Sequence, residues 1–149
     1  MMTLLSAAIR LWTGRTGQAV ELATEARRVF ATIGDAYGLG QSSAVLGRAL
    51  VMTGRVDEGF ALMADGVEGG SVASGLQRPG TDQGLRMTRV ATALQIGEPE
   101  RARDVLPDLE AAAGGGGDDP VVALGMMALQ VGDVDGAARH LARSRDGSA

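Results

Sequence analysis

The sequence contains no cysteine, no lysine and no asparagine, and His140 is its only histidine. Without cysteine, disulfide bonds and thiolate chemistry are excluded. A single histidine is too few for most zinc sites and leaves a nucleophilic triad without a suitable base, so we expect no catalytic residue, no metal and no cofactor. The absence of lysine also excludes a P-loop, which needs a Lys-Ser/Thr pair. These absences argue against an enzyme.

Aromatic residues are also scarce, at 3% of the 149 residues, whereas hydrophobic residues make up 45%. A core of Ala, Leu, Val and Met packs helices closely but suits sheets poorly, because strands favour β-branched and aromatic side chains. The formal net charge of −4 argues against direct nucleic-acid binding, which usually needs a basic surface. No stretch approaches the roughly 18 apolar residues of a membrane span. With no signal peptide in the N-terminal sequence, we expect a cytoplasmic protein and no membrane contact.

A glycine-centred pattern recurs four times, around Gly14, Gly54, Gly97 and Gly132. In each copy a helical apolar pattern runs to the glycine, breaks, and resumes about two residues later. Each glycine can adopt the left-handed conformation that ends a helix, and Asp133 is a predicted N-cap for the helix that follows. The pattern therefore predicts four pairs of antiparallel helices.

Small or compact residues stand at fixed distances from these glycines. A small residue five positions after each turn and a compact one seven positions before it lie where the two antiparallel helices cross most closely. A larger side chain there would push the two backbones apart. The residues after the turns are Ala19, Gly59, Ala102 and Ala137, and those before them are Ala7, Gly47, Val90 and Gly125.

The predicted organisation is one all-α domain over residues 1–149. Its helix pairs are expected at 2–13 with 16–32, 38–53 with 56–68, 82–96 with 98–113, and 120–131 with 133–145. The corresponding repeats cover about 2–33, 38–68, 82–113 and 119–145, with glycine-rich loops at 69–81 and 114–118. Paired carboxylates stand at or just before helix starts, where the helix dipole favours negative charge, so we interpret them as capping groups rather than acid–base catalysts. They are Asp57 with Glu58, Glu98 with Glu100, and Asp118 with Asp119.

Over nearly its full length the chain resembles the tetratricopeptide repeat (TPR) family. The match is best at Leu46, Gly47, Leu50, Gly54, Gly59 and Met63. Arg10 and Arg89 depart from the family pattern, because they stand where it usually has a buried apolar residue. The segment 26–35, followed by Gly38 and Leu39, is also similar to helical repeats of large bacterial transcription regulators and signalling proteins. The resemblance implies a right-handed superhelical stack of about four antiparallel helix pairs.

In the TPR family the first helix of each pair lines a concave surface, which implies a partner-binding groove in this chain. A groove rich in Met, with Trp and Arg as anchors, suits an amphipathic helix or an extended apolar segment of a protein or peptide. The groove residues implied by this register are Leu11, Trp12, Arg48, Val51, Met52, Met87, Leu94, Gln95, Met126 and Gln130. The same residues at helical spacing are also typical of a helical core.

The leading hypothesis is a non-enzymatic scaffold in bacterial regulation. The alternatives are a ligand-sensing segment of a larger transcription regulator, a self-assembling structural module, and an enzyme that holds an anionic substrate with Arg86, Arg89 and Arg101. The first and last helices carry no polar cap, which solenoids usually need. This predicts either a homo-oligomer or a piece of a longer chain.

Overall fold

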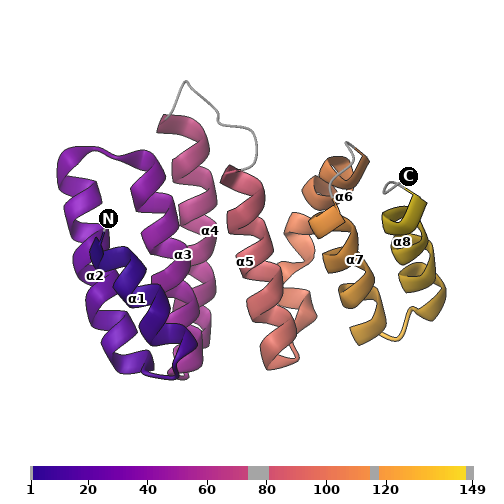
Figure 1. The fold of residues 1–149 in the computed structure, drawn as a ribbon, viewed down its shortest axis with the longest axis horizontal. Coiled ribbons are helices and arrows are strands. Elements are labelled where there is room, and N and C mark those ends of the chain that lie inside the picture. The colour runs from indigo at the N-terminus through magenta and orange to yellow at the C-terminus, as the bar shows by residue number, and fades with distance from the viewer. Residues whose placement is uncertain (1, 74–80, 115–117, 147–149) are drawn as a thin grey trace. The chain divides into compact units, whose positions relative to one another are not determined.

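The computed structural model describes residues 2–73, 81–114 and 118–146. In these ranges the chain forms eight α-helices and one 3-10 helix, and no strand (Figure 1). The predicted all-α class is therefore confirmed. The chain divides into two compact units, residues 1–85 and residues 86–149, and each has its own helix packing.

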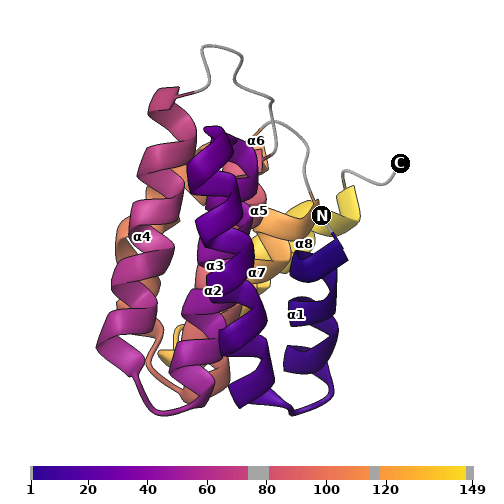
Figure 2. The ribbon, with the colours of Figure 1, turned by 90° about the vertical axis from the view of Figure 1, so that its left-hand side faces the viewer.

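Unit 1 contains four complete helices, and each runs antiparallel to the next (Figures 1 and 2). The most extensive contact joins α3 and α4, and α1 packs on α3 as well as on α2. The first residues of α5 also belong to this unit. The bounds are α1 (Met2–Trp12), α2 (Thr16–Ile33), α3 (Ala36–Met52), α4 (Val56–Ala73) and α5 (Thr81–Ile96).

Helices α3 and α4 approach each other closely at Gly47 of α3 and Gly59 of α4. A β-carbon added to Gly47 would lie 2.6 Å from the carbonyl oxygen of Gly59, a distance that real β-carbons essentially never show. Ala7 and Ala19 are fully buried at the corresponding positions of α1 and α2. The predicted crossing point is therefore confirmed in the second helix pair, and the burial of Ala7 and Ala19 is what the prediction requires in the first.

The turn glycines also behave as predicted. Gly14, Gly54, Gly97 and Gly132 all have φ between 76° and 89°, in the left-handed region. After each of them the backbone makes the same two hydrogen bonds, which cap the preceding helix. At Gly54, for example, the amide of Arg55 donates to the carbonyl of Leu50 over 2.9 Å, and the amide of Gly54 donates to that of Val51 over 3.0 Å.

Unit 2 begins within α5 and ends with an antiparallel pair of helices. Its further elements are η1 (Pro99–Val105), α6 (Leu106–Gly114), α7 (Asp118–Gln130) and α8 (Val134–Asp146), of which α7 packs against both α6 and α8. Asp133 caps α8 as predicted, because its Oδ1 accepts a hydrogen bond of 2.8 Å from the amide of Gly136. Asp57, Glu58 and Glu100 lie in first helical turns, as predicted. Glu98 corrects the capping interpretation, because its side chain makes no capping hydrogen bond at the start of η1 and pairs with Arg101 instead.

Two helix boundaries differ from the prediction. The segment expected as one helix over 98–113 starts as a 3-10 helix and becomes α-helical only at Leu106. Pro107 explains the change, because it has no amide hydrogen and its ring clashes with the carbonyl of the residue four positions earlier. In addition, α4 continues to Ala73 beyond the expected end at 68, since glycine weakens a helix without removing its hydrogen bonds. Residues 74–80 and 115–117 of the two predicted loops lie outside the described residues.

Candidate functional site

A groove of about 340 Å³ lies between α5 and α7 in unit 2, which are the first helices of the third and fourth pairs. Its lining is almost entirely apolar. Of its lining residues, Val90 and Ala123 are buried, whereas Val122 and Met126 are exposed. The lining residues, which define the α5–α7 groove, are Met87, Val90, Ala91, Leu94, Gln95, Val122, Ala123 and Met126.

Helical spacing explains why these side chains share one groove. On α5 they recur three or four positions apart, from Met87 through Leu94, so they lie on one face of the helix. On α7, Val122 and Met126 are likewise one turn apart. The two faces line one groove in the structure, and the sequence pattern does not specify this pairing.

The structure brings four of the five groove residues predicted in unit 2 into this single groove. They are Met87, Leu94 and Gln95 on α5, and Met126 on α7. The fifth, Gln130, lies one turn beyond Met126, and its Nε2 donates a hydrogen bond of 3.2 Å to the carbonyl oxygen of Leu94. Gln130 thus ties the end of α7 to the last turn of α5.

The five groove residues predicted in unit 1 have varied surroundings. Trp12 is 77% exposed, whereas Leu11, Arg48 and Met52 are half-buried. That these residues and those of unit 2 form one continuous surface stays a prediction.

Val51 corrects the predicted groove. Its side chain is 4% exposed, and it packs where α3 crosses α4, against the position of Gly59. Val51 therefore belongs to the core between the two helices and is not available to a partner. The prediction was wrong at this position because its spacing on α3 suits both the core and the groove.

The three arginines considered for an anionic substrate are each paired with a carboxylate of unit 2. Arg89, which departs from the family pattern, is a largely buried side chain at 12% exposure. Its charge at a usually apolar position is compensated by an aspartate 2.7 Å away. This pairing offers no cluster of available cations for an anion. The pairs are Arg86 with Asp108, Arg89 with Asp104, and Arg101 with Glu98.

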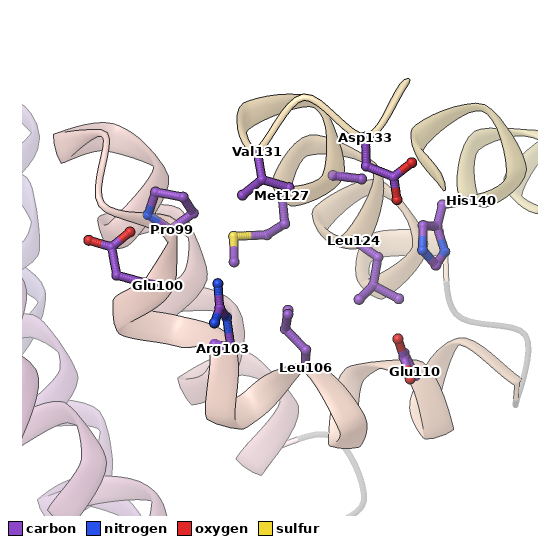
Figure 3. A pocket seen from close by; sticks show the side chains of 11 residues that line it. Pro99, Glu100, Arg103, Leu106, Glu110, Leu124, Met127, Val131, Asp133 and His140 are labelled. Atoms are coloured by element: carbon purple, nitrogen blue, oxygen red, sulfur yellow. The ribbon is translucent and has the colours of Figure 1, made fainter. Parts of the chain in front are cut away.

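A second cavity in unit 2, of about 210 Å³, has a mixed lining (Figure 3). Leu106, Leu124 and Met127 provide apolar surface from α6 and α7. His140 of α8 stands at one end, with Glu110 and Asp133 on the same side of the cavity. The remaining charged groups are Glu100 and Arg103 of η1.

His140 is the least satisfied polar group of this cavity. Its Nδ1 is inaccessible to solvent and makes no hydrogen bond with any part of the chain that the structure describes. A buried polar atom without a partner costs about 1–3 kcal/mol. Sequence reasoning missed the cavity, because its charged residues come from three separate segments with no common motif.

Metal-binding clusters and membrane-spanning helices were searched for in the residues that the structure describes. No group of three or more His, Asp or Glu side chains among them could hold a metal ion. Within the same ranges, no helix has both the length and the apolar character needed to cross a bilayer.

Comparison with known proteins finds no match to this chain among protein-family models, curated proteins or solved structures. The TPR resemblance therefore rests on the residues quoted above.

Proposed function

We propose that this chain is a non-enzymatic helical-repeat scaffold of the TPR kind, which binds a protein or peptide segment in the α5–α7 groove. Its resemblance to the repeats of bacterial regulators supports a proposed role in cytoplasmic regulation. One observation carries the proposal. Met87, Leu94, Gln95 and Met126, selected only by their register in the repeat, line the same apolar groove.

The chemistry of the groove indicates the kind of segment it would bind. Its volume of about 340 Å³ suits a few apolar side chains rather than a whole domain. Met87 and Met126 have flexible thioether side chains that can adjust to differing apolar shapes. Gln95 supplies the one polar side chain of the lining, and an amide of this kind can both donate and accept hydrogen bonds. An amphipathic helix or an extended apolar segment meets these requirements.

A matched pair of substitutions on α7 tests the proposal. Met126 lines the groove and Leu129 does not, although both side chains are 52% exposed. Peptides selected from a random display library on the full chain should bind in solution with a dissociation constant that rises at least about tenfold in Met126→Glu. Leu129→Glu should leave it unchanged. Equal losses in both variants, or no selectable apolar peptide, would exclude the groove as the binding site.

The mixed cavity supports a second candidate function, in which the chain senses a small molecule. A ligand that pairs with the charged groups around His140 and covers Leu124 and Met127 would stabilise the folded chain by mass action. A thermal-shift screen with small metabolites tests this possibility. A compound that stabilises the native chain, and stabilises a Glu110→Gln variant less, would favour sensing over peptide binding.

A further inference from the structure

Helix α1 carries a row of large apolar side chains that the rest of unit 1 leaves uncovered. Met2, Leu5, Ile9 and Trp12 are 84%, 61%, 48% and 77% exposed. We call these four residues the α1 stripe. Isolated apolar residues on a surface are ordinary, but four on one short helix form a contiguous patch.

The stripe lies on the face of α1 that is turned away from its own unit. Ala7 is fully buried in the core cluster that also contains Ala23 and Leu50. At about 100° per residue, each stripe residue lies roughly 140–160° around the helix from Ala7. Figure 2 shows α1 at the edge of unit 1, with the other helices of this unit on one side of it.

The spacing of the α1 stripe matches a helix–helix seam. Its residues follow one another at intervals of three, four and three positions, which is the a/d pattern of a coiled coil. This order of intervals is the same in both directions along the helix. Two α1 helices placed antiparallel therefore match along the whole stripe, with Leu5 of one copy opposite Ile9 of the other and Met2 opposite Trp12.

We propose that two copies of this chain associate through an antiparallel, two-fold symmetric pairing of their α1 stripes. The four side chains expose on the order of 500 Å² of apolar surface, near the upper end for the largest patch on a monomer. A symmetric dimer covers this area on both copies, so it buries on the order of 1,000 Å² in total, which is near the lower bound for a biological interface and suits a weak, reversible dimer. The dimer is independent of the α5–α7 groove.

The helix dipoles favour the antiparallel orientation, because they oppose one another in it. Arg10, the only charged side chain of α1, lies roughly 120° around the helix from the middle of the stripe, so it stays outside the seam. Ser6 and Ala8 flank the middle of the stripe, and their small side chains allow close approach.

Sedimentation equilibrium on the full chain tests the pairing. We expect a reversible dimer at micromolar concentrations. Trp12, the only tryptophan, should emit at shorter wavelength as the dimer forms, because the partner covers its ring. Ile9→Glu should raise the dissociation constant more than about tenfold, since a symmetric interface carries the charge twice. The control is Val29→Glu, which changes a similarly exposed residue of α2 and should leave dimerisation unchanged.

The antiparallel register has a separate test, because a chain without cysteine accepts single reporter thiols. A mixture of Leu5→Cys and Ile9→Cys chains should form mixed disulfides faster than either variant alone forms its own. Circular dichroism checks that every variant keeps its helix content. A chain that stays monomeric, or a dimer unaffected by Ile9→Glu, overturns the α1 interface. A preference for disulfides between identical positions overturns the antiparallel arrangement.

Discussion

Gly47 of α3 and Gly59 of α4 meet backbone to backbone, so that a methyl group on either glycine would overlap the carbonyl oxygen of the other. The contact repeats one heptad along the helices, where a β-carbon on Gly40 would lie 3.2 Å from the carbonyl oxygen of Gly66. Glycine is a poor helix former, so helix propensity does not explain its presence at these positions. Its value is the short distance between two helices that carry much of the core of unit 1.

Gly47→Ala should therefore destabilise the chain by about 1–3 kcal/mol, although alanine is the better helix former. Gly17→Ala in α2 is the control, because a β-carbon there has nothing within 4 Å. This control should be neutral or more stable by about 0.5 kcal/mol. Urea denaturation followed by circular dichroism measures both. Equal effects would show that the close crossing has no energetic weight.

Substitutions at Gly54 test the energetic cost of the left-handed backbone conformation, because no neighbouring atom crowds this position. Its φ is 89°, and a β-carbon there would meet no atom within 4 Å. Gly54→Asn should cost less than about 1 kcal/mol, and Gly54→Val clearly more, because asparagine tolerates the left-handed region and β-branched residues do not. Thermal unfolding of the two variants gives the comparison. A more stable valine variant would contradict the assigned turn.

Asp133 should stabilise the start of α8 through its hydrogen bond to the amide of Gly136. Asp133→Ala should cost about 1 kcal/mol, and Asp133→Ser should recover most of it, because serine is also a good N-cap. Amide hydrogen exchange in the first turn of α8 should accelerate in the alanine variant alone. Unchanged exchange there would mean that the cap is dispensable.

Arg89 and Asp104 should respond differently to removal of one partner. Asp104→Asn leaves a largely buried guanidinium without its carboxylate and should cost about 1–3 kcal/mol. Arg89→Met removes the buried charge and keeps an apolar chain in its place, so it should cost less. Chemical denaturation of both variants decides the order. The reverse order would show that the ion pair itself is strongly stabilising.

Glu25 is expected to titrate below its ordinary range, because a hydrogen bond from Arg28 and the adjacent positive charge lower its pKa. The folded pKa then lies below the unfolded one. The pair therefore contributes stability at higher pH, and the contribution is lost as the pH falls through the folded pKa of Glu25. NMR titration should show the Glu25 pKa rising in Arg28→Gln. An unchanged pKa would mean that solvent screens the pair completely.

Most helix positions follow from the sequence because their signals are local. Apart from the end of α4, each helix end lies within about two residues of its predicted position. Glycine at a left-handed turn and a small residue at a crossing point are properties of single positions, so they can be read without knowing the neighbours. The α-helix expected to start near residue 98 starts only at Leu106, because Pro107 disfavours α-helical hydrogen bonding in the turn before it.

The candidate site was only partly predictable. Repeat register selected Met87, Leu94 and Met126 for the groove, but the same register also selected Val51, which the structure buries. Helical spacing defines which residues share a face. It does not specify whether another helix covers that face, and this difference separates a core residue from a binding residue.

The sequence by itself determined that the chain is helical, where most of its helices begin and end, and which glycines allow α3 and α4 to cross closely. Those features depend on backbone conformation and on spacing along one helix. Only the tertiary structure decided that α5 and α7 enclose an apolar groove, that an aspartate neutralises Arg89, and that Trp12 lies on an uncovered stripe. Each of these depends on contacts between segments distant in the sequence, because burial is a property of the neighbours that cover a side chain.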